Sequence, residues 1–166
     1  MIDADVIPPL VEILFNADFE VKRTAAWAVC NISCGGTKEN IRYGFSLIKG
    51  CRMNYMKEFY DKFGVNIRYL ADQGCIKALC ELLTSPEAKL VLGCLQALEN
   101  ILKVGKADQE EGLTQANVFV ERVLECQGVH QKISCLLANR NQEITATAWR
   151  LSDTIWPGNN NDQDSD

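Results

Sequence analysis

Trp27 and Asn31 lie one helical turn apart, and both side chains suit the binding of a basic peptide. An indole face supports the aliphatic stem of Lys or Arg and adds a cation–π attraction of about 0.5–2 kcal/mol. An Asn amide both donates and accepts, so it can hold an extended backbone without reading its sequence. Glu20 and Thr24 share this helix face, and the Glu20 carboxylate favours positive charge. We call these four residues the Trp–Asn ridge.

The sequence gives little support for catalysis, nucleic-acid binding or insertion into a membrane. His130 is the only histidine, beside an expected helix start, and no phosphate loop, carboxylate pair or nucleophile motif accompanies it. We therefore expect no catalytic residue, no cofactor and no enzyme activity. A net charge of −5 and a pI near 5.0 disfavour nucleic acid, which requires a basic stripe. No apolar run reaches the roughly 18–20 residues of a membrane span, and the N-terminus does not read as a signal peptide.

The cysteines admit three interpretations: core packing, disulfides or zinc. Most of the eight alternate with Leu, Ala and Val at helical spacing, where free Cys packs as a small hydrophobe. Zinc is disfavoured because there is no CxxC pair and a single histidine. We expect core cysteines and no metal. They are Cys30, Cys34, Cys51, Cys75, Cys80, Cys94, Cys126 and Cys135.

An internal repeat organises the chain. The segment from Val6 aligns without gaps with the segment from Cys75, and a third copy begins at Val129. Each copy reads as a short apolar helix, a polar break and a longer helix, with a further helix in front, as in NIRYLADQG and NVFVERVLECQG. This armadillo-like pattern predicts an all-α, right-handed solenoid of about three stacked repeats.

Helix ends carry recognisable signals. Ser85-Pro86-Glu87 is expected to start the long helix of the second copy, and Asp18 and Asn141 are expected to cap the equivalent helices. Gly35-Gly36 and Gly105 are expected to end the first two long helices.

The spacing of the copies indicates an insertion. Asn40-Ile41-Arg42-Tyr43 recurs as Asn66-Ile67-Arg68-Tyr69, so the 26 residues 44–69 exceed a normal repeat of about 40–47 residues. This segment is a packed aromatic helix, a translated intron or gene-model error, or a binding element. The smaller excess of residues between the second and third copies is assigned to a polar loop around GKADQEEGLTQAN. We expect repeats over 1–156, in units of roughly 1–36, 37–105 and 106–156, and a disordered acidic tail over 157–166.

One apolar stripe on each long helix is expected to face the core, with the Trp–Asn ridge roughly 100–145° away. The stripes are Val21, Ala25, Ala28, Val29 and Ile32; Leu90, Cys94, Ala97, Leu98 and Ile101; and Ile144, Ala148, Leu151, Ser152 and Ile155.

Later copies change the ridge. Gln96 and Asn100 take its two central places in the second copy, and Arg150 and Thr154 take them in the third. Alternatively, the indole packs against the neighbouring repeat, and Asn31 bonds an adjacent turn at the helix end.

The stretch AAWAVCNISCGGTKENIRY, followed by LADQGCIKALCELL and LENILKVG, resembles the final repeats of the importin alpha family, the adaptors that bind nuclear localisation signals. With the insertion set aside, the likeness reaches about Trp156. The combination is specific, because the W-x-x-x-N array, the GGT turn and the IRYLxxQGCIKxLCxLL block occur together.

The resemblance implies that Trp27 and Asn31 belong to a minor signal-binding site on the concave face. It also implies contacts of the last repeat with the nuclear export factor and a nucleoporin. Two positions depart from the family: Thr24 stands where Glu is common, and Cys34 where Ser is common. The importin-beta-binding segment and the major-site repeats have no counterpart, so we expect weak signal binding and no recruitment of importin beta.

The sequence therefore predicts a fragment of a nuclear import adaptor, present in cytoplasm and nucleus. It would bind basic signals of cargo proteins through Trp27, Asn31, Asn100 and Glu20. The alternative is another armadillo-repeat scaffold, outside nuclear import, that binds an acidic or hydrophobic partner.

Overall fold

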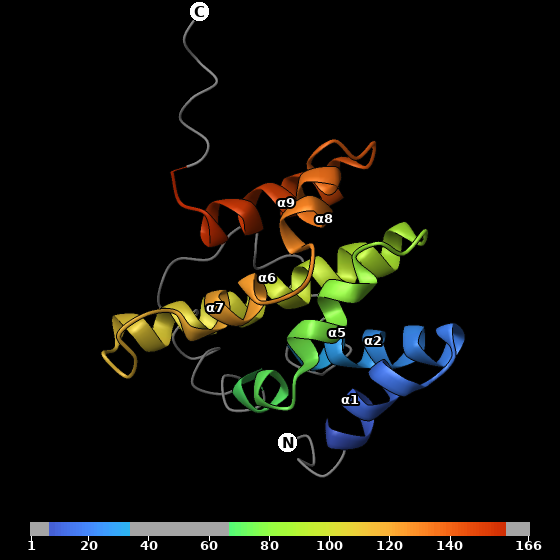
Figure 1. Cartoon of the computed structure of the whole chain (residues 1–166), viewed down its shortest axis with the longest axis horizontal. Helices are drawn as coiled ribbons and strands as arrows, with labels where there is room; N and C mark the ends of the chain where they lie inside the picture. The colour runs from blue at the N-terminus through green and yellow to red at the C-terminus, as the bar shows by residue number, and fades with distance from the viewer. Residues whose placement is uncertain (1–6, 34–66, 159–166) are drawn as a thin grey trace, which may run out of the picture.

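A computed structural model describes residues 7–33 and 67–158 of the chain. Within these ranges all regular structure is helical (Figure 1), so the expected all-α class is confirmed. Residues 67–72 also form a helical segment, which precedes α5 as the sequence predicted. The helices are α1 (Ile7–Asn16), α2 (Phe19–Ser33), α5 (Cys75–Leu82), α6 (Ala88–Glu110), α7 (Val118–Leu124), α8 (Val129–Leu137) and α9 (Gln142–Ile155).

Several sequence predictions lie outside these ranges. The proposed insertion over 44–69 is described only from residue 67, and the expected disordered tail only at 157–158. Gly35-Gly36, Cys34 and Cys51 are not among the described residues either.

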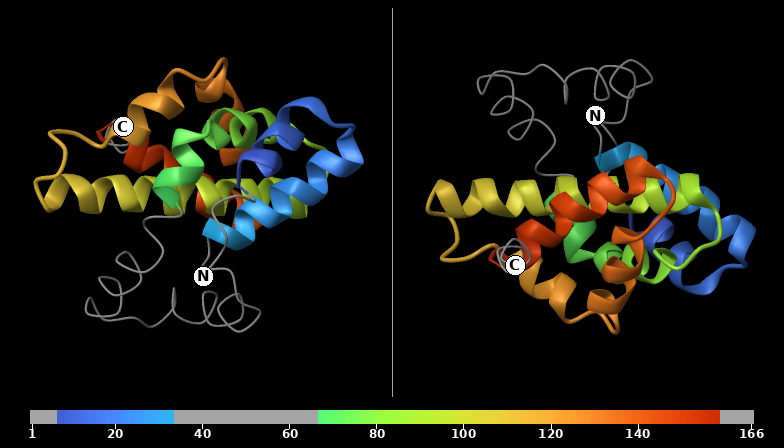
Figure 2. Two further views of the ribbon diagram at one scale, coloured as in Figure 1. Left: turned by 90° about the horizontal axis from the view of Figure 1, so that it is seen from below. Right: turned by 90° about the horizontal axis from the view of Figure 1, so that it is seen from above.

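The long helix α6 lies at the centre of the molecule, with α2 and α9 on opposite sides of it (Figure 1). Each short helix packs on the long helix that follows it: α1 on α2, α5 on α6 and α8 on α9. Seen edge-on in Figure 2 (left), the short helices form one layer and the long helices another. Among the helices of residues 7–33 and 67–158, none combines the length and the apolar character that a membrane span requires.

The predicted core stripes of α6 and α9 are entirely buried, which confirms the prediction for these two helices. The stripe of α2 is partly wrong: Val21 is 49% exposed and Ala28 is half-buried, whereas Ala26 is buried without having been predicted. The difference follows from position. α6 has a long helix on each side, while α2 packs against α6 on one side only among the described helices. Periodicity locates a stripe, but burial needs a covering element.

Gly105 does not end α6, contrary to the prediction. The helix continues to Glu110, and Gly112, with φ of 75°, follows it. A Cβ on Gly105 would stand 2.1 Å from Asn117 Oδ1 and 2.7 Å from Phe119 Cδ2. This glycine is therefore needed for close helix packing. The polar loop is shorter than predicted, because the first half of its sequence belongs to α6.

The capping predictions have mixed outcomes. Asn141 caps α9 as expected, since its Oδ1 accepts from the Glu143 N–H at 2.9 Å. α6 begins only at Ala88, and Ser85 Oγ accepts from the Glu87 N–H at 3.2 Å, so the predicted start was a few residues early. The N-cap of α6 is Glu87, two residues after the predicted Ser85, which is within the usual variation of helix boundaries.

An ion pair between Arg68 and the buried Asp108 carboxylate holds the 67–72 segment against α6. Arg68 Nε donates to Asp108 Oδ2 at 2.9 Å, and its Nη2 contacts the other carboxylate oxygen. The Asp108 side chain is almost completely buried, so a paired charge is required there.

Candidate peptide-binding site

Trp27 lies at the junction of α2 and α6, and its side chain is 37% exposed. Its ring atoms Cζ3 and Cη2 lie 3.5 and 3.7 Å from the position that a Cβ on Gly93 would occupy. One edge of the indole therefore packs against α6 at Gly93, where no side chain intervenes, and over a third of the Trp27 surface remains exposed to solvent. Both interpretations of Trp27 contain part of the answer: it packs against the neighbouring unit and it remains accessible.

The two asparagines of the predicted site differ in surroundings. Asn31 is exposed, one turn beyond Trp27 on α2. Asn100 is half-buried, and its Nδ2 donates to the Ser33 carbonyl at 3.3 Å. That carbonyl is at the C-terminal end of α2, where helical carbonyls lack intrahelical partners. Asn100 thus joins α6 to α2, while Asn31 presents its amide to solvent.

Glu20 lies at the start of α2, where it forms an ion pair within the helix. Its Oε2 lies 2.6 Å from Arg23 Nη2, and Arg23 Nη1 lies 3.5 Å from Glu87 Oε2 on the next unit. Thr24 donates its hydroxyl to the Glu20 carbonyl at 3.1 Å. The spacing of Glu20, Arg23 and Trp27 places all three on one face of α2.

Arg150, the α9 counterpart of Trp27, contacts α6 directly. Its Nε and Nη2 donate to the two carboxylate oxygens of Glu99 at 3.0 and 3.2 Å, and Lys103 Nζ lies 2.9 Å from the same carboxylate. Burial raises the pKa of Glu99, but hydrogen bonds from Arg150 and Lys103 and their positive charge outweigh it, so its pKa falls below the ordinary value.

Sequence reasoning missed two residues of this surface, Gly93 and Glu99. A glycine inside a helix pattern carries no signal of what packs over it. Glu99 reads as an ordinary acidic residue, since its two cationic partners lie four and 51 positions further on. Only the i to i+4 pairing with Lys103 could have drawn attention to it.

The cysteines mostly behave as predicted. Cys30, Cys75, Cys80 and Cys94 are buried, Cys126 is half-buried and Cys135 is exposed, and all described cysteines are free thiols. Burial raises the pKa of Cys75 to about 12, which keeps this thiol protonated at neutral pH. In the part of the chain that the structure describes, no three His, Cys, Asp or Glu side chains gather as a metal site would require.

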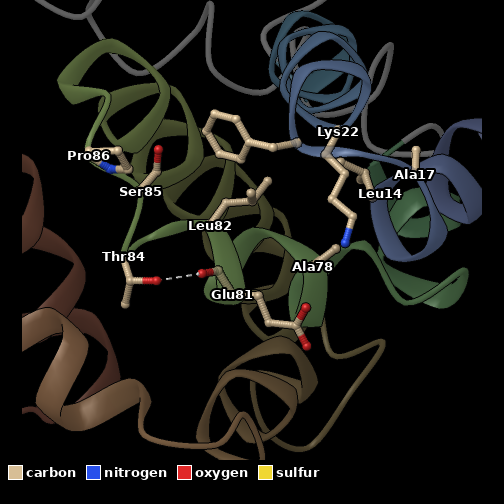
Figure 3. A pocket seen from close by; sticks show the side chains of 10 residues that line it. Leu14, Ala17, Lys22, Ala78, Glu81, Leu82, Thr84, Ser85 and Pro86 are labelled. Atoms are coloured by element: carbon tan, nitrogen blue, oxygen red, sulfur yellow. Dashed lines mark hydrogen bonds between the residues drawn. The ribbon is translucent and has the colours of Figure 1, made fainter.

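An open hollow of about 390 Å³ lies away from the ridge, between the α1–α2 turn and the α5–α6 connection. Figure 3 shows Lys22 and Glu81 beside the apolar side chains of Leu14, Leu82 and Pro86. The dashed line marks the Thr84 hydroxyl donating to the Glu81 carbonyl at 3.1 Å. None of the predicted site residues lines this hollow.

The repeats place the chain in a known class. The family profile described as Armadillo/beta-catenin-like repeat matches residues 1–34 and 65–103. The chain is an armadillo-repeat protein. Among solved structures, the designed armadillo repeat protein YIII(Dq)4CqI is 19% identical, with a TM-score of 0.46 over 90% of this chain and 64% of its own.

Within that class, the chain is a relative of the importin alpha subunits. Importin subunit alpha-4 of Arabidopsis thaliana is 35% identical over 94% of this chain, and importin subunit alpha-1b of Oryza sativa subsp. japonica is 34% identical over 92%. Importin subunit alpha-3 of Arabidopsis thaliana is 40% identical over 60% of this chain. The chain spans only 24%, 24% and 19% of these three relatives.

Proposed function

We propose that this chain binds extended basic peptides, the nuclear localisation signals of cargo proteins, through the Trp–Asn ridge as part of a nuclear import adaptor. The observation that carries the proposal is the position of Trp27: its indole packs against Gly93, yet the residue is 37% exposed, and the exposed Asn31 lies one turn away. A braced aromatic face loses little freedom when a lysine stem lies on it, which favours binding.

The ridge supplies complementary functions to such a peptide. The indole receives a Lys or Arg stem, and Asn31 bonds the peptide backbone. Glu20 and Glu87, on either side of Arg23, add carboxylates near the same face. Asn100 contributes mainly by fixing α6 against the end of α2. The similarity to importin alpha subunits supports nuclear import as the process served.

Further expectations belong to this proposal. The chain would act without catalysis, move between cytoplasm and nucleus, and contact the nuclear export factor and a nucleoporin through α8 and α9. The division of the chain into repeat units 1–36, 37–105 and 106–156 also belongs to this proposal. An armadillo scaffold for an acidic or hydrophobic partner remains the competing function.

The test is calorimetric titration with a synthetic bipartite basic signal peptide. We expect a Kd below about 1 mM, equivalent to about −4 kcal/mol. Trp27→Ala should weaken binding by about 2- to 30-fold, because the cation–π contribution is about 0.5–2 kcal/mol.

Trp149→Ala is the matched control, since this indole on α9 is similarly exposed at 44% but lies off the predicted ridge. Equal binding by the wild type and Trp27→Ala would remove the ridge as the site. Preference for an acidic peptide of the same length would favour the competing scaffold.

A further inference from the structure

The two ends of the long-helix layer carry opposite charge arrangements. At the α2 end, Arg23 lies between two carboxylates, 2.6 Å from Glu20 and 3.5 Å from Glu87. At the α9 end, Glu99 lies between two cations, Lys103 at 2.9 Å and Arg150 at 3.0 Å. The first cluster has one excess negative charge and the second one excess positive charge.

Exposure strengthens the positive character of the α9 end. The Arg150 and Lys103 side chains are 50% and 35% exposed, whereas that of Glu99 is 12% exposed. Solvent, or a peptide lying across these helices, therefore meets the two cations rather than the carboxylate between them. At the α2 end the most exposed member is a carboxylate: the Glu20 side chain is 69% exposed, whereas those of Arg23 and Glu87 are 38% and 35% exposed.

Within residues 7–33 and 67–158, the contacts of the two cations leave some donors for a ligand, mostly on Lys103. Arg150 uses Nε and Nη2 on Glu99, Nη2 again on the Thr147 hydroxyl at 3.1 Å, and Nη1 on the Ala146 carbonyl at 3.4 Å. A guanidinium has five N–H donors and an ammonium three. These contacts also hold Arg150 in place, so an incoming carboxylate would meet a cation that is already oriented.

We propose that the Trp–Asn ridge and the Arg150–Lys103 pair together select an extended peptide of mixed charge, with a Lys or Arg on Trp27 and an Asp or Glu at the Arg150–Lys103 pair. This inference rests on the proposed function, since it assumes that a basic residue lies on Trp27. Neighbouring helices lie about 8–10 Å apart, so α2 and α9 are separated by about 16–20 Å. An extended chain advances about 3.3–3.6 Å per residue, which separates the two charged residues by about four to six positions.

The experiment uses two synthetic peptides that differ at one end. Both carry a Lys-Arg pair and a five-residue Gly-Ser spacer; one ends in Glu-Glu and the other in Gln-Gln. Each is also made in the reverse order, because chain direction is free. At low salt we expect the wild type to bind the better-oriented Glu-Glu peptide about two- to fivefold more tightly than its Gln-Gln partner, as for an exposed ion pair.

Arg150→Gln should abolish this preference while leaving the Gln-Gln peptide bound at least as tightly. Arg140→Gln is the matched control: it removes the same charge at an exposed position ten residues earlier, just before α9, and should keep the preference. Lys103→Gln is the second variant if loss of Arg150 unfolds the chain, and it should reduce the preference.

The outcomes separate the two proposals. A wild type that binds both peptides equally, or an Arg150→Gln variant that keeps the preference, overturns the mixed-charge inference alone, provided that Trp27→Ala still weakens binding. If Trp27→Ala has no effect on either peptide, the proposed function fails and this inference fails with it.

Discussion

At the scale of single residues, Trp27 has two different roles: its ring packs against α6, and we propose that it also contacts a bound peptide. The edge of its ring packs against α6 at Gly93, while the exposed part of the residue is what a lysine stem would use. Glu99 is a similar case, since it is covered by the fold yet governs the charge beside it through Arg150 and Lys103. Gly93 thus affects how Trp27 is exposed to solvent, and Glu99 does the same for Arg150 and Lys103.

The ion pairs of Glu99 predict a pH dependence of stability. Because the folded-state pKa of Glu99 lies below the ordinary value of 4.5, ionised Glu99 stabilises the fold above about that pH, and this contribution disappears as the pH falls through the folded pKa. Glu99→Gln mimics the protonated form. We expect the wild type to be more stable than Glu99→Gln at pH 7, and the two to converge toward pH 3.

Urea unfolding at several pH values measures this difference in free energy. Glu110→Gln, on the same helix but with a largely exposed carboxylate, controls for the loss of one negative charge. A wild-type advantage that stays constant, or grows, as the pH falls would contradict the assignment.

At the scale of helices, α6 shows why a glycine can be misread. Gly105 was expected to end the helix, yet the chain stays helical through it. A glycine suits this place because Asn117 and Phe119 occupy the space where a Cβ would be. Asn117 also caps α7 and donates its Nδ2 to the Leu102 carbonyl at 2.8 Å. The glycine thus lets α7 lie close to α6.

Gly105→Ala should therefore destabilise the protein. A new Cβ would overlap Asn117 Oδ1, and overpacking typically costs about 1–3 kcal/mol, more than the roughly 1 kcal/mol that Ala gains over Gly in a helix. The midpoint of chemical unfolding measures the change. Gly93→Ala is the comparison in the same helix, since its nearest neighbour would be 3.2 Å away, and it should destabilise less. Equal or higher stability for Gly105→Ala would refute the packing argument.

At the scale of the whole molecule, α6 connects all the units that the structure describes. It packs against α2 and α9 as well as α5 and α7, so its buried stripe belongs to two inter-unit interfaces. Stacked repeats gain their stability from such neighbouring interfaces. Damage to the centre of α6 should therefore spread to both sides.

Leu98→Ala tests this coupling, because Leu98 is fully buried within α6. Removing a buried leucine side chain costs about 2–5 kcal/mol. We expect a lower unfolding free energy and faster hydrogen exchange in both α2 and α9. Leu113→Ala, at a 66% exposed position, should leave both unchanged. Faster exchange confined to α6 alone would show that the units are not coupled.

The sequence by itself determined the all-α class, the helix order and the core stripes of α6 and α9, because the 3.6-residue period and repeated spacing are local properties. The α2 stripe failed at Val21, since burial depends on what lies beside a helix rather than on its own pattern. The sequence also identified Trp27 as the centre of the candidate site. Peptide binding at this site stays a prediction.

Only the tertiary structure decided how the site residues meet. It placed the Trp27 ring on Gly93, tied Asn100 to the end of α2, and brought Arg150 onto Glu99 across 51 positions of sequence. The physical reason is that charge and packing act through space. A contact between distant helices leaves no periodic trace in either helix, so these pairings could not be obtained from spacing alone.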